Sequence, residues 1–218
     1  YALSNSSAKL LHISTVSVYG RCRDNFINEE SKCIPKNKYQ IVKREEEIVL
    51  SDITEKLNCE LFLFRPTQII GEKSINCQSI IKSIKSNNFL KNYFLNSFYR
   101  NRPMHLVTSN FLADSIVKVI SGGFQPGTYI ISQDTAKENN YIDICEMIQF
   151  KIFGKGRKLY QKLPELPLKW IFVIAYKFFR INEVKPFAKF ISKYPIIKPK
   201  YYKSFKRDFL EYLEHTLY

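Results

Sequence analysis

The stretch LLHISTV at residues 10–16 decides the fold of this chain. Its apolar residues are typical of a strand buried within a sheet, and the run ends in the hydroxyl residues Ser14 and Thr15. A polar segment at residues 21–37 follows and predicts a loop. The sequence KYQIVK at residues 38–43 then begins the apolar pattern of a helix. We therefore expect a strand, a loop and a helix in this order.

The predicted helix carries Tyr39 and Lys43 four residues apart, so both side chains project from one face about one turn apart. An ordinary tyrosine ionises near pH ~10, but a positive charge close by favours the phenolate. A lysine roughly 6 Å away, at an effective dielectric constant of ~20, supplies on the order of 3 kcal/mol. The pair can therefore act as a base. The alternative is a solvated helix face, because this spacing occurs by chance in many helices.

The helical pattern extends to about residue 57, because apolar side chains recur at helical spacing. These apolar residues are Ile41, Val42, Ile48, Val49 and Ile53. The acidic run EEE at residues 45–47 predicts the solvated face of the same helix. A capping or ion-pair role for one of these glutamates is the alternative.

The run ELFLF at residues 60–64 is almost wholly apolar, as expected of a strand buried on both faces. Strand, helix and strand in this order predict a parallel crossover unit. The sequence RPT at residues 65–67 then leaves the sheet at its carboxyl edge, where open α/β sheets bind ligands. Further patterns predict helices at residues 75–89, 110–120, 143–153 and 205–217, and strands at residues 104–107 and 127–132.

Three motifs, in this order and spacing, resemble the extended short-chain dehydrogenase/reductase family, which contains nucleotide-sugar epimerases and dehydratases. They are HISTVSVYG at residues 12–20, YxxxK at residues 39–43 and LFRPTQIIG at residues 63–71. The resemblance implies an α/β fold, a partial Rossmann-type parallel sheet with a smaller mixed α/β substrate-binding lobe. It places the C-terminal half of an NAD(P)-binding domain at residues 1–72. Residues 73–218 then form mainly the substrate-binding lobe, with interleaving boundaries.

The glycine-rich turn that cradles a dinucleotide pyrophosphate is expected upstream of the first strand in this family. None of the seven glycines of the chain forms that fingerprint. The resemblance therefore implies that the chain is the C-terminal part of a longer protein. This part is not expected to hold a dinucleotide tightly by itself.

The resemblance also implies the roles of individual residues. Tyr39 takes the proton of a sugar 4-hydroxyl as hydride leaves its carbon for the nicotinamide of NAD or NADP. Lys43 holds the nicotinamide ribose, and Thr15 orients the sugar oxygen, with Ser14 as its backup. The residues expected to bind the cofactor are Ser14, Tyr39, Lys43, Pro66 and Ile69. The residues expected to bind the nucleotide-linked sugar are Thr15, Arg100 and Arg102, because arginine grips a diphosphate with two hydrogen bonds.

Val16 and Ser17 follow Thr15, where the sugar dehydratases that this strand resembles carry an Asp–Glu pair for water elimination. We therefore favour an epimerase or a 4-ketoreductase. A sterol-type dehydrogenase of the same superfamily is one alternative, since the apolar residues 166–180 suit a lipidic substrate. The other is a non-catalytic, truncated member of the fold that acts as a binding or membrane-surface module. Gln40 supports that alternative, because a long side chain beside Tyr39 crowds the cofactor.

Positive charge is concentrated near the C-terminus, where residues 151–207 carry 16 Lys and Arg against 2 Glu, a surplus equal to the net charge of +14. This region is consistent with peripheral contact with an anionic membrane. A core-packing helix of the substrate-binding lobe at residues 166–180 is the alternative. No nucleic-acid motif accompanies it, so nucleic acid is not expected. The five cysteines lack metal-ligand spacing, which predicts no metal site and a cytoplasmic protein. In the family, the helix that bears Tyr39 packs in a dimer interface, so we expect a homodimer.

Overall fold

The structure, a computed structural model, describes residues 8–20, 26–71, 74–86, 88–99, 103–134, 136–154 and 196–197. Several predictions concern residues outside these ranges. They are the roles of Arg100 and Arg102, the apolar segment at residues 166–180, the helix at residues 205–217 and most of the basic region at residues 151–207.

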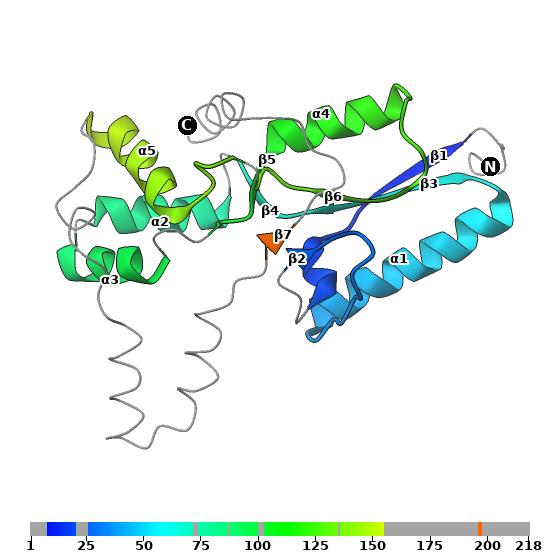
Figure 1. The fold of residues 1–218 in the computed structure, drawn as a ribbon, viewed down its shortest axis with the longest axis horizontal. Helices are drawn as coiled ribbons and strands as arrows, with labels where there is room; N and C mark the ends of the chain where they lie inside the picture. The colour runs from blue at the N-terminus through cyan, green and yellow to red at the C-terminus, as the bar shows by residue number, and fades with distance from the viewer. Residues whose placement is uncertain are drawn as a thin grey trace, which may run out of the picture.

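A parallel three-stranded sheet of order β1-β3-β6 forms one half of the described molecule (Figure 1). Its strands are β1 (Lys9–Ile13), β3 (Glu60–Pro66) and β6 (Gly127–Ile131). The pairing of β1 with β3 runs from Lys9 opposite Glu60 to Ile13 opposite Phe64. Helix α1 (Lys38–Leu57) connects these two strands, which confirms the predicted parallel crossover unit.

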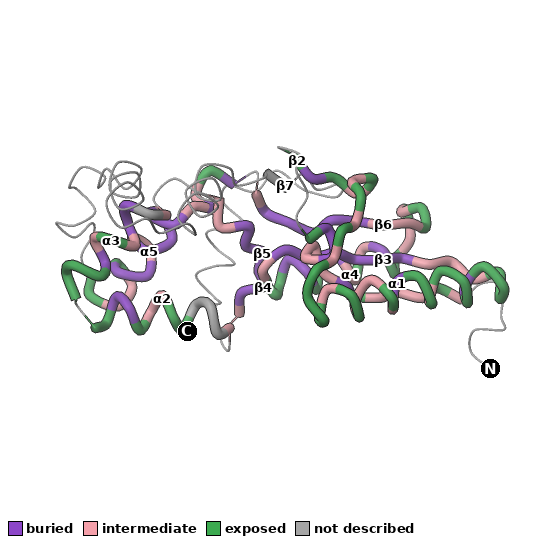
Figure 2. The backbone as a smooth tube through the Cα atoms, turned by 90° about the horizontal axis from the view of Figure 1, so that it is seen from below, coloured by how far each residue is buried: buried purple, intermediate pink, exposed green. Residues whose placement is uncertain are grey.

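Helices α1 and α4 (Ser109–Ile120) cover opposite faces of this sheet (Figures 1 and 2). Successive residues of β3 point to opposite faces. Phe62 and Phe64 therefore join Phe111 of α4 in the larger apolar core. Arg65, one residue further along β3, instead points toward α1.

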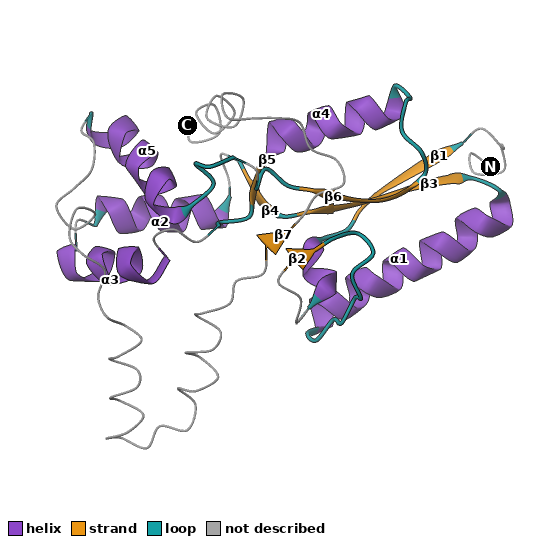
Figure 3. Ribbon diagram, viewed as in Figure 1, coloured by secondary structure: helices purple, strands orange, loops and turns teal. Residues whose placement is uncertain are grey.

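A helical lobe lies beyond one end of the sheet (Figure 3). It contains α2 (Ile75–Lys85), α3 (Phe89–Tyr99) and α5 (Tyr141–Phe153), and α5 contacts both of the other helices. Between the lobe and the sheet, β4 (Gln68–Ile70) pairs in parallel with β5 (Leu106–Thr108). This mixed α/β architecture with a parallel sheet confirms the predicted fold class.

The single helix predicted at residues 75–89 is wrong, because the chain forms α2 and then the unpredicted helix α3. The side chain of Asn88 supplies the physical reason. Its Oδ1 accepts a hydrogen bond from the N–H of Lys91 at 3.0 Å, which caps a new helix start. The polar residues after Lys85 are therefore a helix boundary.

The predicted strand at residues 10–16 is too long, since β1 ends at Ile13 and a 3-10 turn, η2 (Val16–Tyr19), follows. Gly20 ends this turn with φ of +59°, and a Cβ atom there would lie 1.7 Å from the carbonyl oxygen of Ile34. Glycine is therefore required at this position. The close approach lets Ile34 donate its N–H to the oxygen of Tyr19 at 3.3 Å.

The segment predicted as a loop at residues 21–37 contains one short strand in its described part, β2 (Phe26–Ile27). It pairs in parallel with β7 (Ile196–Ile197), as Figure 1 shows beneath the sheet. Ile27 is buried in a small apolar cluster with Val18 and Tyr19. The segment is thereby packed against η2.

Candidate active site

The carboxyl ends of the three parallel strands meet at one edge of the sheet. Ile13 pairs with Phe64, and Pro66 pairs with Ile131, so the residues that follow these strands lie along the same edge. Ser14 is buried there and donates its N–H to the oxygen of Phe64 at 2.7 Å. Ligands bind at this edge in open α/β sheets.

Thr15 follows Ser14 and begins the 3-10 turn η2. Its Oγ1 accepts a hydrogen bond from the N–H of Ser17 at 3.2 Å and donates one to the Oγ of Ser17 at 3.2 Å. Because η2 contacts α1, Thr15 is held on a turn beside the helix that bears Tyr39 and Lys43.

A complete capping box fixes the start of α1. The Oδ1 of Asn37 accepts a hydrogen bond from the N–H of Gln40 at 2.9 Å, and the Oε1 of Gln40 accepts from the N–H of Asn37 at 3.4 Å. The same oxygen accepts from the N–H of Lys36 at 2.8 Å. The side chain of Gln40 is therefore turned back toward the helix start, where it satisfies backbone groups beside Tyr39.

Replacing Asn37 with alanine is expected to lower the free energy of unfolding by about 1 kcal/mol, because the backbone N–H of Gln40 loses its side-chain acceptor. Urea unfolding followed by circular dichroism measures this change. Asn37→Asp keeps an acceptor at the cap and is the matched control, with an expected loss of less than about 0.5 kcal/mol. Equal losses for both variants would contradict the capping role.

Tyr39 lies in the first turn of α1, and its side chain is 58% exposed. Lys43 lies one turn further on, with its side chain 24% exposed. Its Nζ lies 2.8 Å from Oε2 of Glu46, and the same oxygen lies 3.4 Å from Nε2 of His12 on β1. The phenol is thus open to a ligand, while the ammonium group is held between the helix and the sheet.

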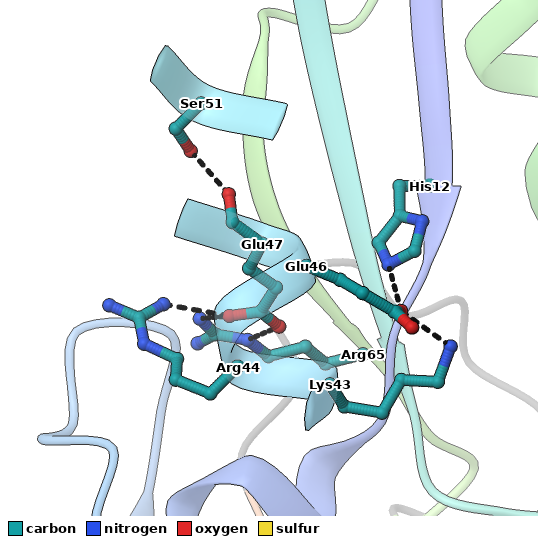
Figure 4. A network of polar contacts seen from close by, with 7 residues as sticks. All are labelled: His12, Lys43, Arg44, Glu46, Glu47, Ser51 and Arg65. Atoms are coloured by element: carbon teal, nitrogen blue, oxygen red, sulfur yellow. Dashed lines mark hydrogen bonds and ion pairs between the residues drawn. The ribbon is translucent and has the colours of Figure 1, made fainter. Parts of the chain in front are cut away.

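Glu47 is fully buried, so the prediction that residues 45–47 lie on a solvated face is wrong for this residue. Arg65 donates from Nε to its Oε1 at 2.9 Å and from Nη2 to its Oε2 at 2.8 Å (Figure 4). Arg44 donates from Nη1 to the same Oε2 at 2.7 Å. Burial raises the pKa of the Glu47 carboxyl, but the hydrogen bonds and charge of Arg65 outweigh it and bring this pKa below its usual value.

Tyr19 and Glu29 extend this buried ion pair to other elements. Nη1 of Arg65 donates to the Oη of Tyr19 at 2.8 Å, and burial raises the pKa of that phenol to about 12. Glu29 accepts a hydrogen bond at Oε1 from the N–H of Ile130 on β6 at 3.0 Å. Its carbonyl oxygen lies 3.5 Å from Nη1 of Arg65. The network therefore joins η2, α1, β3 and β6 behind the candidate site.

Two features of the sequence indicate the ion pair between Glu47 and Arg65. Tyr39, Lys43 and Glu47 are spaced four residues apart, so they follow one side of the helix. Arg65 is the charged residue at the end of an apolar strand, and a buried arginine requires an anion. Neither feature alone identifies the partner of Glu47 or of Arg65, but the two features together predict that these residues form an ion pair.

Residues 1–94 match the model of the NAD dependent epimerase/dehydratase family.

The family match extends from β1 through α2 and into α3, so it includes all three motifs of the sequence analysis. The family is NAD-dependent, which agrees with the expectation of NAD or NADP. No curated protein matches the chain.

Solved structures share the fold at low sequence identity. The UDP-N-acetylglucosamine 4-epimerase from Methanobrevibacter ruminantium M1, in complex with UDP-N-acetylmuramic acid, is 14% identical with a TM-score of 0.59, and the alignment covers 99% of this chain and 64% of that chain. The UDP-glucuronic acid 4-epimerase from Bacillus cereus, in complex with NAD, is 19% identical with a TM-score of 0.50, and the coverage is 69% and 48%.

The enzyme WbmG from Bordetella bronchiseptica, in complex with NAD, is 15% identical with a TM-score of 0.51, and the alignment covers 66% of this chain and 43% of that chain. At these identities the likeness shows the fold. The chain spans less than two thirds of the length of each of these three proteins.

Of the remaining residues expected from the family resemblance, two lie on the strands β3 and β4 and two lie outside the described ranges. Pro66 is the last residue of β3 and is buried, whereas Ile69 on β4 is 40% exposed. Arg100 and Arg102 are outside the described residues. The structure therefore gives the positions of Ser14, Thr15, Tyr39, Lys43, Pro66 and Ile69, and their roles stay predictions.

In the described part of the chain, no group of three or more His, Cys, Asp or Glu side chains is placed to hold a metal ion. No helix among the same residues has both the length and the apolar character needed to cross a membrane.

Proposed function

We propose that this chain provides the acid–base and substrate-side residues of an NAD(P)-dependent epimerase or 4-ketoreductase that acts on a nucleotide-linked sugar. One observation carries the proposal. An exposed tyrosine, Tyr39, stands in the first turn of a capped helix with Lys43 one turn further on, within a segment that matches the epimerase family. Thr15 lies on the adjoining turn at the carboxyl edge of the sheet.

Each of the three residues has a role in this proposal. Tyr39 takes the proton of the sugar hydroxyl, and Thr15 orients the oxygen of that hydroxyl by turning its O–H from Ser17 to the sugar. Lys43 supplies positive charge that favours the phenolate, and it binds the ribose next to the nicotinamide. A nicotinamide bound beside Lys43 would supply the hydride acceptor and donor that this reaction requires. The exposed phenol and the neighbouring ammonium group fit such a ribose, because both present hydrogen-bonding atoms one helical turn apart.

The substrate class is also a proposal. The solved epimerases described above act on UDP-sugars according to their names, which supports a sugar linked to a nucleoside diphosphate. Arg100 and Arg102 are proposed to bind its diphosphate. A cytoplasmic location, with peripheral membrane contact through residues 151–207, completes the proposal.

Replacing Lys43 with alanine is expected to weaken NADH binding roughly tenfold or more, because a charged hydrogen bond contributes about 1.5–3 kcal/mol. Fluorescence titration measures the dissociation constant for the chain and for the protein in its natural full length. Lys56→Ala, at the exposed far end of α1, is the matched control and should leave binding unchanged. Equal loss in both variants, or no NADH binding by the full-length protein, would contradict the proposal.

We also propose a homodimer in which the outward face of α1 is buried. Several apolar side chains of this helix are exposed, among them Ile48 at 46% and Val49 at 53%. Val49→Lys is expected to weaken dimerisation at least tenfold, because it introduces two charges at a two-fold interface. Sedimentation velocity measures this change. Val117→Lys, on α4, is the control, and dissociation by that variant instead would place the interface elsewhere.

A further inference from the structure

The ammonium group of Lys43 is held by a carboxylate that sequence reasoning placed in solvent. Nζ of Lys43 lies 2.8 Å from Oε2 of Glu46, three residues further along α1 (Figure 4). A lysine side chain has four rotatable bonds and samples many rotamers unless a partner holds it. The contact with Glu46 therefore sets the direction of the ammonium group.

Glu46 is itself placed by two elements of the fold. Its Oε2 lies 3.4 Å from Nε2 of His12, which belongs to β1. The backbone of His12 is fixed within the sheet opposite Leu63, and its side chain is 19% exposed. Glu46 thus stands between a helix and a strand: its carboxylate accepts a hydrogen bond from Lys43 and lies close to the ring of His12, whose Nε2 makes no hydrogen bond with the described residues.

The neighbouring arginine side chains bind the next glutamate, Glu47. Arg44 and Arg65 both donate to Glu47. The two consecutive glutamates therefore bind different cations. Glu47 accepts hydrogen bonds from the guanidinium groups, and Glu46 accepts one from the ammonium group. The hydrogen bond from Lys43 lowers the pKa of the Glu46 carboxyl, so Glu46 is a carboxylate at neutral pH.

We propose that Glu46 is a positioning residue for Lys43. It holds the ammonium group on the side of α1 that faces His12, and it acts on a bound ligand only through Lys43. The role of Lys43 itself rests on the proposed function, whereas the contact between Glu46 and Lys43 belongs to the chain with or without a cofactor. One measurement tests the contact between Glu46 and Lys43 without a cofactor, and a second tests its effect on cofactor binding.

The first measurement is the rate at which acetic anhydride modifies Lys43, followed by mass spectrometry. The reagent must reach the nitrogen of Lys43, and the contact of 2.8 Å with Oε2 of Glu46 holds that nitrogen against the carboxylate. Glu46→Ala and Glu46→Gln are expected to raise the rate about threefold, the scale of an exposed ion pair. His12→Ala should give a smaller increase. Glu45→Ala, an exposed neighbour, is the control, and equal rates in Glu45→Ala and Glu46→Ala would overturn the inference.

The second measurement is NADH affinity in a double-mutant cycle. Glu46→Ala is expected to weaken binding about threefold with Lys43 present and to have no further effect in the Lys43→Ala background. The same loss in both backgrounds would overturn the inference, because Glu46 would then act independently of Lys43. If the full-length protein binds no NADH, the proposed function fails, and the modification rates decide the inference by themselves.

Discussion

Glu47→Ala is expected to lower the free energy of unfolding by roughly 3–5 kcal/mol, the usual cost of removing one partner of a buried ion pair. Glu47 is fully buried and Arg65 is 3% exposed, so the guanidinium would remain in the interior without a carboxylate. It would also lose two hydrogen bonds, of 2.9 and 2.8 Å. Because domains are stable by about 5–15 kcal/mol, the loss is a large part of the total. Urea unfolding followed by circular dichroism measures it.

Two further variants make this test specific. Glu45→Ala removes a charge from the exposed side of the same helix and should change stability by less than about 0.5 kcal/mol. Replacing both partners, as in E47L with R65M, should recover much of the loss, because no unpaired charge stays buried. If Glu47→Ala resembled Glu45→Ala, the buried pair would not stabilise the fold.

The same pair predicts how stability depends on pH. The pKa of the Glu47 carboxyl is lower in the folded protein than its usual value, so its contribution is fully present above the unfolded pKa of about 4.3. The contribution is lost as the pH falls through the lower, folded value. The difference in stability between the native chain and Glu47→Gln should therefore be constant near pH 7 and shrink below about pH 4.

Sequence reasoning located the elements of the site well where local signals agree. The helix was predicted from residue 38 to about residue 57 by its apolar pattern, and α1 spans Lys38–Leu57, with the cap formed by Asn37 and Gln40 at its start. The strand at residues 60–64 was predicted from its apolar run, and β3 continues two residues further to include Arg65 and Pro66. Periodicity therefore identifies the type of an element better than its limits.

Periodicity did not identify which face of α1 is buried. The apolar side chains that defined the helix are largely exposed, Ile48 and Val49 among them, while the charged residue Glu47 faces the sheet. The reason is a tertiary contact, since Arg65 comes from a strand 18 residues further along the chain and selects the face that carries a carboxylate. A pattern within one helix contains no information about that partner.

Tyr39→Phe is expected to lower kcat by about 10²–10⁴ in the protein in its natural full length, because it removes the hydroxyl that is proposed to accept the substrate proton. The loss of one hydrogen bond should weaken NADH binding by no more than about tenfold. The side chain is 58% exposed, so the free energy of unfolding should change by less than about 0.5 kcal/mol. Steady-state rates, fluorescence titration and urea unfolding measure the three quantities.

The combination of these three results is what distinguishes a base from a residue that only supports the helix. If Tyr39 only supported the helix, Tyr39→Phe would lower stability and activity together. If Tyr39 is the base, the substitution lowers the rate and leaves the fold and the cofactor site intact. Lys43→Ala should differ from Tyr39→Phe by weakening NADH binding as well as the rate, since its ammonium group contacts the ribose in the proposal. If Tyr39→Phe kept kcat within a few fold of the native protein, Tyr39 would not be the base, and the exposed phenol at the start of α1 would need another explanation.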